Sequence, residues 1–276
     1  KRGVVGSWCL FGSVSGVMLG SLTMTLLYWL LSPEALANWG WRVPFIGGLA
    51  IFALGVWLRR DIAQDQVEER RPLCEPSNPL FEVLSKMPLR VLHISSALLL
   101  FSTSFYVFFV WFPTYLTQIL PVPIAHADEI NLLGMALLLA SIFGFGSLSD
   151  QLGFKVVVLT GTAFITLSVY PLFVFVDHGN VGAALTTVLL FALGCGAVIG
   201  PMPAFLVSCF PSNVRSSAIG LSYNITLAIF GGTAPLVATW FIDTTQNLAS
   251  PGIYLAVLGA VSFFATVKLK PSYGNA

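Results

Sequence analysis

Eight long apolar stretches alternate with short polar segments along the chain, and none of the eight contains an Asp, Glu, Lys or Arg residue. Their lengths of about 15 to 30 residues suit α-helices that cross a hydrocarbon layer ~30 Å thick. Strands of a membrane β-barrel would instead appear as segments of about ten residues with alternating polarity. The pattern predicts an all-α membrane protein with eight transmembrane helices, at Gly6–Leu31, Pro44–Leu58, Val91–Leu116, Ile130–Leu148, Val156–Val176, Val181–Phe210, Ala218–Ile242 and Ile253–Val267.

Basic residues predict the orientation of these helices. If the ends of the stretches alternate between two sides, all Lys and Arg residues except Arg42 lie on one side. The positive-inside rule makes that side cytoplasmic, so we expect both termini in the cytoplasm and the protein in the lipid bilayer of the plasma membrane, the inner membrane of a bacterium. A mean hydropathy of +0.86 and 9% charged residues exclude a soluble globular protein, and the net charge of +1 gives no indication of a nucleic-acid partner.

One hydrophilic segment, residues 59–90, divides the chain into two spans in residues 1–58 and six spans in residues 91–276. The charged run that begins at Asp61 is typical of a solvated linker. Further on, Asn78 and Pro79 resemble an N-cap and a first-turn proline. The apolar residues that follow them predict a short amphipathic helix at the membrane surface.

The Cys and His residues form no catalytic or metal-binding motif. The chain has neither a Cys-x-x-Cys nor a His-Glu-x-x-His spacing, and three of its four cysteines, Cys9, Cys195 and Cys209, lie within predicted spans. We therefore expect reduced packing thiols, no metal site, no cofactor and no enzymatic activity.

Glycine and proline interrupt two of the later spans. Such interruptions are tolerated at membrane depth only where protein or a water-filled cavity satisfies the backbone, and they indicate a transport pathway. Close packing of helices is the alternative explanation for the glycines. The sixth span contains the candidates for helix bending, namely Gly194, Gly196, Gly200, Pro201 and Pro203, and the seventh contains Gly231, Gly232 and Pro235.

A short polar connection between the fourth and fifth spans carries the most specific motif, Gly146-Ser-Leu-Ser-Asp150-Gln-Leu-Gly153-Phe-Lys155. Gly153 can take the positive φ that a tight turn requires. Asp150 can accept hydrogen bonds or face the N-terminus of a neighbouring helix. The segment resembles the G-x-L-S-D-x-x-G-x-K loop of the major facilitator superfamily, in which the Asp closes a cytoplasmic gate. Gln151 and Phe154 depart from that pattern, which usually contains more basic residues.

Further segments resemble the metabolite:proton symporter branch of that superfamily. The residues Trp-Gly-Trp-Arg-Val-Pro-Phe at 39–45 resemble its WGWR-[IV]-PF element, and the segment from Phe210 to Arg215 with the following span resembles its last cytoplasmic loop and eleventh helix. Residues 111–116 and 245–248 are most similar to proline/betaine transporters. The resemblance adds Arg215 to the gate candidates Gly146, Asp150, Gly153 and Lys155.

This resemblance implies a partial twelve-helix fold. The eight spans would be helices five to twelve, with residues 1–58 as the last two helices of the N-terminal half, 59–90 as the central cytoplasmic loop and 91–276 as the six-helix C-terminal half. The first four helices would be missing partners of a chain that starts at Lys1 without a Met. The residues that couple proton movement lie largely in those front helices in the family, which agrees with spans that contain no charged residue.

The resemblance also implies that the third and sixth spans line a central substrate cavity and that the seventh flanks it. Aromatic faces there can bind a quaternary ammonium by cation–π attraction. Packing between helices or against lipid is the alternative for the aromatic residues, and hydrogen bonding between helices is the alternative for the polar pair in the seventh span. The substrate-cavity candidates are Tyr106, Phe109, Tyr115, Tyr223 and Asn224.

We therefore expect a transporter that binds a small-molecule substrate and a proton and takes up a zwitterion such as proline or betaine by alternating access. An organic-acid symporter for di- or tricarboxylates and a non-transporting truncated membrane fragment are the alternatives. The spans contain no Arg or Lys residue that would pair with a multiply charged anion, which favours the zwitterion.

Overall fold

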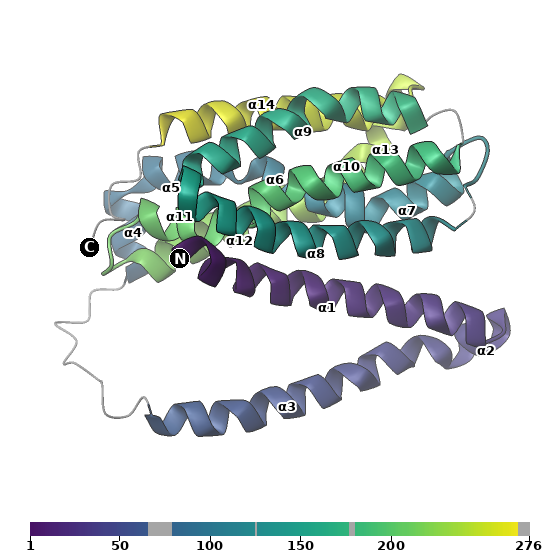
Figure 1. Cartoon of the computed structure of the whole chain (residues 1–276), viewed down its shortest axis with the longest axis horizontal. Coiled ribbons are helices and arrows are strands. Elements are labelled where there is room, and N and C mark those ends of the chain that lie inside the picture. The colour runs from purple at the N-terminus through teal and green to yellow at the C-terminus, as the bar shows by residue number, and fades with distance from the viewer. Residues whose placement is uncertain (66–78, 125, 177–179, 270–276) are drawn as a thin grey trace. The chain divides into compact units, whose positions relative to one another are not determined.

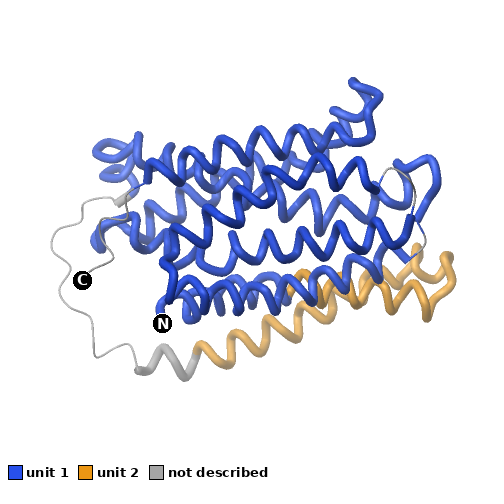
Figure 2. Tube along the Cα trace, turned by 45° about the horizontal axis from the view of Figure 1, so that its top comes forward, with its two compact units in different colours: residues 1–15, 79–276 blue, residues 16–78 orange. Residues whose placement is uncertain are grey.

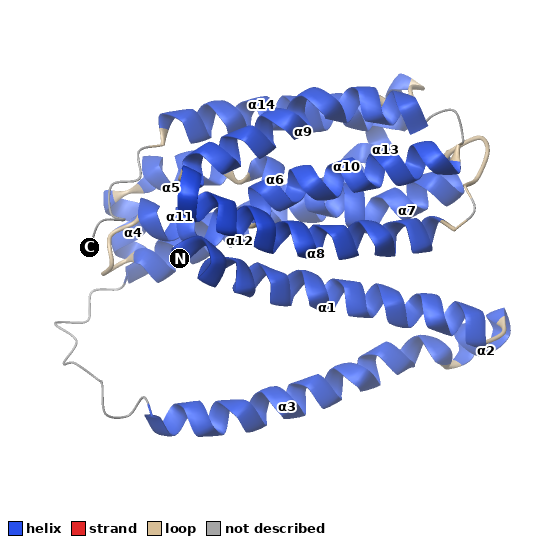
Figure 3. Ribbon diagram, viewed as in Figure 1, coloured by secondary structure: helices blue, strands red, loops and turns tan. Residues whose placement is uncertain are grey.

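The structure is a computed structural model that describes residues 1–65, 79–124, 126–176 and 180–269, and every regular element in these ranges is a helix (Figures 1 and 3). Eight stretches of these residues are helical, long and apolar enough to cross a membrane, which confirms the predicted all-α fold and its number of spans. Residues 66–78 of the hydrophilic segment, which include Cys74, lie outside the described residues. The eight stretches are Arg2–Leu30, Gly40–Arg59, Pro88–Ile119, Ala127–Leu152, Phe154–Val176, Val181–Cys209, Arg215–Thr245 and Ser250–Lys268.

The chain divides into two compact units, Lys1–Ser15 with Pro79–Ala276 and, separately, Gly16–Asn78 (Figure 2). The boundary falls within α1 (Arg2–Leu30), so that helix contributes to both units. The sequence also suggests a division into the halves of a transporter, at residues 1–58 and 91–276. That division stays a prediction.

The smaller unit contains the second part of α1, the short helix α2 (Pro33–Asn38), the 3-10 turn η1 (Gly40–Arg42) and α3 (Val43–Asp65). Ser32 is the N-cap of α2, because its side chain accepts a hydrogen bond from the N–H of Ala35 at 3.3 Å. The guanidinium of Arg42 lies 4.3 Å from the centre of the Trp41 ring, a cation–π contact.

Four long helices pack against one another in the larger unit: α8 (Ala127–Leu152), α9 (Phe154–Val176), α10 (Val181–Ile199) and α14 (Ser250–Lys268). Helix α10 packs on α8 and α9, and α9 packs on α14. Small residues permit the close approach: a Cβ atom at Gly161 of α9 would lie 2.7 Å from the Cβ of Ala197 of α10. Close backbone approach of this kind drives helix association in lipid, where apolar burial contributes little.

The third span is a series of short helices rather than one regular helix. It is preceded by α4 (Pro79–Lys86), the short amphipathic helix that the sequence indicates. Two of its segments are π-helical turns, in which an extra residue widens the helix. The series runs α5 (Pro88–Ala97), α6 (Leu99–Tyr106), the π turn η3 (Val107–Trp111), α7 (Phe112–Thr114) and the π turn η4 (Tyr115–Ile119).

A break at Leu98 separates α5 from α6, and a hydroxyl of α14 bridges it. The Oγ of Ser262 accepts a hydrogen bond from the N–H of Leu100 at 3.1 Å and lies 2.7 Å from the carbonyl of Ala97, to which it donates. Nearer the end of α14, the His93 side chain of α5 lies within hydrogen-bond distance of the Ala265 carbonyl, at 3.1 Å. Side chains thus bind backbone groups at two levels between α5–α6 and α14.

In the sixth span, the interruption lies at Gly200 and Pro201, between α10 and α11 (Met202–Cys209). Gly194 and Gly196 lie inside the unbroken helix α10, where a Cβ at Gly194 would lie 2.7 Å from Ile165 of α9. Pro203 lies in the first turn of α11, a position that prolines favour. Bending of the sixth span at these five residues during function stays a prediction.

The seventh span contains a π turn before its proline. It consists of α12 (Arg215–Thr226), the π turn η5 (Leu227–Gly231) and α13 (Gly232–Thr245), with Pro235 inside α13. Both the π turn and the proline alter the regular backbone hydrogen bonds of the span.

Candidate functional site

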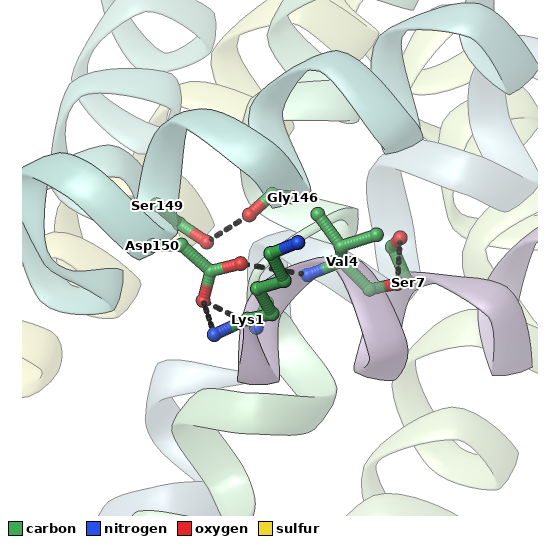
Figure 4. Close-up of polar contacts among 7 residues, drawn as sticks. Lys1, Val4, Ser7, Gly146, Ser149 and Asp150 are labelled. Atoms are coloured by element: carbon green, nitrogen blue, oxygen red, sulfur yellow. Dashed lines mark hydrogen bonds and ion pairs between the residues drawn. The ribbon is translucent and has the colours of Figure 1, made fainter.

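Asp150 lies in the last turn of α8, beside the first turn of α1 (Figure 4). Its Oδ1 accepts a hydrogen bond from the N–H of Gly3 at 2.7 Å, and its Oδ2 accepts one from the N–H of Val4 at 3.2 Å. The first N–H groups of a helix lack partners within the helix and carry partial positive charge, so the carboxylate satisfies two of them. Gly153, with a φ of 93°, ends α8 just beyond this contact.

Glycines at the same place let the two helix backbones touch. A Cβ atom at Gly146 would lie 3.0 Å from the Cβ of Ser7 and 3.2 Å from the carbonyl oxygen of Gly3, and a Cβ at Gly3 would collide with the Gly146 carbonyl. Ser7 and Ser149 are buried, and each donates its hydroxyl backwards within its own helix, to Val4 and to Gly146, at 2.7 Å. We call this meeting of α1 and α8, formed by Gly3, Val4, Ser7, Gly146 and Asp150, the gate contact.

The two basic gate candidates, Lys155 and Arg215, form hydrogen bonds outside the gate contact. Lys155 Nζ donates to the carbonyls of Val267 and Leu269 at 2.6 and 2.8 Å, at the C-terminal end of α14, where a cation is favoured. Arg215 Nε donates to the carbonyl of Phe210 at 3.1 Å, in the connection between α11 and α12. Of the five predicted gate residues, the structure brings Gly146 and Asp150 into the contact with α1.

Two candidate cavity residues, Tyr106 of α6 and Tyr223 of α12, lie where the third and seventh spans pack together. The Tyr223 ring lies 5.8 Å from the ring of Phe101, and a Cβ at Gly231 would lie 2.9 Å from the Tyr106 ring. Both tyrosines are half-buried.

Phe109 and Tyr115 lie in the packed interior instead, with 2% and 0% of their surface exposed. The Tyr115 hydroxyl donates to the carbonyl of Leu248 at 3.2 Å, and its ring lies 5.5 Å from that of Phe112. The Phe109 carbonyl accepts a hydrogen bond from Asn131 Nδ2 of α8 at 3.2 Å, which satisfies a backbone group of the π turn η3. Contact of these two side chains with substrate stays a prediction.

The fifth cavity candidate, Asn224, is exposed and donates from Nδ2 to the carbonyl of Gly220 at 2.8 Å, within its own helix. The sequence reasoning missed Gly3 and Ser7, which complete the gate contact. Their four-residue spacing is a small-x-x-x-small pattern, the signal that could have indicated a close helix contact.

Comparison with known proteins agrees with this arrangement. The family model described as Major Facilitator Superfamily matches residues 1–235. A relative from Staphylococcus aureus (strain MSSA476) is 28% identical over 287 residues, which cover 100% of this chain and 62% of the relative. A relative from Escherichia coli (strain K12) is 28% identical over 288 residues, which cover 98% of this chain and 56% of the relative.

The names of both relatives include the words proline/betaine transporter. The chain spans about six tenths of the length of these curated relatives, as the shares of 62% and 56% show. The family match covers most of the chain, whose described residues contain eight helices long and apolar enough to span a membrane. The chain therefore belongs to the Major Facilitator Superfamily.

Proposed function

We propose that the chain is part of a secondary transporter that takes up a small zwitterion, such as proline or betaine, together with protons by alternating access. The observation that carries this proposal is the gate contact, in which Asp150 of α8 accepts hydrogen bonds from the first turn of α1. In the proposed mechanism these two helix ends separate when the cytoplasmic side opens. The contact therefore stabilises the closed cytoplasmic gate, and its strength sets the balance between the two states.

Substrate binding is assigned in this proposal to the half-buried Tyr106 and Tyr223, whose aromatic rings suit a cationic headgroup. Charged residues of the described spans lie near the span ends, so the middle of these spans offers no basic partner to a tricarboxylate. An unpaired anion of that kind would carry a large desolvation penalty. The family membership and the names of the two relatives support the zwitterion.

Uptake assays test the proposed substrate. The complete open reading frame that encodes this chain is expressed in a strain without proline and betaine uptake, and the initial rate of radiolabelled proline uptake is measured with competitors. We expect proline and glycine betaine to compete and citrate to leave uptake unchanged, and we expect a protonophore to abolish accumulation. Uptake of citrate or 2-oxoglutarate that proline does not inhibit would reassign the protein to organic acids.

Tyrosine variants test the proposed site. Tyr106→Leu and Tyr223→Leu remove an aromatic face worth about 1–2 kcal/mol to a desolvated cation, so KM should rise by roughly 5- to 30-fold. The corresponding Phe variants keep the face and should keep most of the affinity. Tyr170→Leu, at an exposed tyrosine of α9, is the matched control and should leave KM unchanged. Equal effects at all three positions would contradict the assigned site.

The gate contact is tested with two alanine variants of the same helix. Gly146→Ala places a methyl group against Ser7 and Gly3 of α1, whereas a Cβ at Gly144 meets nothing within 4 Å. Overpacking typically costs about 1–3 kcal/mol, so Gly146→Ala should shift the gate equilibrium by roughly fivefold or more and change the uptake rate. Gly144→Ala should transport like the parent. A parental rate in Gly146→Ala would remove the contact from the mechanism.

A further inference from the structure

Helix α4 presents three different faces around its axis. Val83 is fully buried, with 0% of its surface exposed. Glu82 and Lys86, one turn apart, form an ion pair at 2.9 Å on a second face. Phe81 and Leu84, three residues apart and therefore neighbours on the helix surface, form a third face with 72% and 54% exposure.

The buried face fixes α4 to the end of the spans. Helix α4 contacts both α5 and α12, and it lies at the end of the larger unit where these two helices begin (Figure 1). The apolar face of Phe81 and Leu84 is thus held at the level where the third and seventh spans start. An amphipathic helix held at this level lies in the plane of the membrane interface.

The same exposed apolar surface continues into the third span. Helix α5 starts at Pro88, directly after α4, and its Leu89 and Leu92 are 79% and 64% exposed, while Ile94 is fully buried. Exposed leucines on the outside of a spanning helix face lipid acyl chains. The face of Phe81 and Leu84 therefore adjoins an exposed apolar surface of the third span, which we expect to face lipid.

We propose that α4 is a membrane anchor whose Phe81 and Leu84 side chains insert among the acyl chains of the adjacent leaflet, which is the cytoplasmic leaflet in the orientation expected from the basic residues. Because Glu82 neutralises Lys86, the insertion is hydrophobic and needs no anionic lipid. The polar face of the ion pair points to water. Because α4 also contacts α12, the position of the anchor in the leaflet is coupled to the position of the helix that carries Tyr223.

The proposal is tested with single cysteines labelled with the fluorophore NBD in the 276-residue chain, with Cys9 and Cys74 replaced by serine. Phe81→Cys and Leu84→Cys report on the inserted face, and Lys86→Cys is the matched control on the polar face of the same helix, with a side chain that is 70% exposed. The labelled protein is reconstituted in phosphatidylethanolamine–phosphatidylglycerol vesicles, and the parent without an introduced cysteine gives the background from the two buried cysteines.

Labels at Phe81→Cys and Leu84→Cys should emit at shorter wavelength and lose most of their fluorescence to lipids with a nitroxide on the upper acyl chain. The label at Lys86→Cys should be quenched by aqueous iodide instead. The lipid quenching should persist in vesicles of zwitterionic lipid without phosphatidylglycerol. Iodide quenching at Phe81→Cys and Leu84→Cys would place the face in water and overturn the proposal. Protection from both quenchers would assign the face to protein, either a second copy or another segment, and would also overturn it.

Discussion

A single carboxylate joins two helix ends that are 147 residues apart in the chain, since Asp150 accepts the N–H of Gly3. Asp150→Asn keeps the shape of the side chain but removes its charge, which is worth about 1 kcal/mol against a helix N-terminus. We expect the equilibrium constant for closing the gate to fall by about fivefold. The turnover rate should change, and the substrate affinity should change by at most the same factor. Uptake rates and equilibrium binding of proline measure the two effects.

Asp128→Asn is the control for this variant, because it removes a carboxylate at the other end of the same helix. It should leave turnover as in the parent protein. If Asp150→Asn transported at the parental rate in a folded protein, the charge at this position would have no part in gating.

Tyr115 offers a second prediction at this scale. Its hydroxyl binds the carbonyl of Leu248 and its ring is fully buried, so we expect it to contribute to stability. Tyr115→Phe should lower the free energy of unfolding by about 0.5–1 kcal/mol, the usual value of one hydrogen bond in a membrane protein. Tyr115→Ala should cost about 3–5 kcal/mol because it leaves a large cavity. Thermal unfolding in detergent measures both, and a change in proline affinity in Tyr115→Phe without a change in stability would contradict this role.

Asp150 and Tyr115 also show which individual residues could be assigned a role from the sequence. Asp150 lies in a tight polar turn with glycines on both sides, a pattern that leaves few roles for an acidic residue. Its partners in α1 are backbone N–H groups, which any residue provides and which therefore leave no mark in the sequence. Tyr115 could not be assigned in advance, since a tyrosine at a span end suits a packed core and a substrate site equally.

At the scale of elements, the third span shows how far a regular helical period predicts side-chain faces. The spacing of Phe105, Phe108, Phe109 and Phe112 places all four on one face of a regular α-helix. The π turn η3 runs from Val107 to Trp111 and inserts an extra residue among them. Phe108, Phe109 and Phe112 are nevertheless all buried, and the Phe105 ring lies 5.7 Å from that of Phe109. The predicted face is thus largely kept, and Phe108 stacks on Phe191 of α10 at 3.4 Å between ring centres.

The break at Leu98 gives a prediction for one hydroxyl. Ser262→Ala removes the group that accepts the N–H of Leu100 and donates to Ala97, and it leaves two buried backbone groups without this partner. We expect a loss of about 1–2 kcal/mol in the free energy of unfolding. Unfolding in detergent by heat or denaturant measures the loss.

Ser250→Ala is the matched control on the same helix. Ser250 is also buried, but its hydroxyl has no hydrogen-bond partner among the residues that the structure describes, so its removal should change stability little or slightly raise it. Equal losses in the two variants would show that the hydroxyl of Ser262 has no special role at the break.

At the scale of the whole molecule, the hydrophobic pattern predicted the number and order of the spans, because every span must satisfy its backbone internally and be long enough to cross the bilayer. The same pattern could not reveal that the third span is divided into short helices, or that the sixth span is broken at Gly200. Glycine and proline mark some breaks, as at Pro201, but no proline or glycine occurs at Leu98.

The orientation of the spans gives a prediction that cysteine labelling can test. In a protein with Cys9 and Cys74 replaced by serine, Val122→Cys follows the third span and Asn213→Cys precedes the seventh, and both native residues are exposed. By the positive-inside rule, a membrane-impermeant maleimide should label Val122→Cys in intact spheroplasts and Asn213→Cys only after permeabilisation. The reverse pattern would invert the topology.

The end of α14 has a consequence for how the protein opens. Lys155 of α9 binds the carbonyls of Val267 and Leu269, and His93 of α5 lies against that of Ala265, so three helices are joined at one helical turn. Local opening of any one of them has to break bonds shared with the others, which makes the three ends a single cooperative unit. Their backbone amides should therefore exchange hydrogen for deuterium at one common rate, and Lys155→Met should let the end of α14 exchange faster and independently of α5.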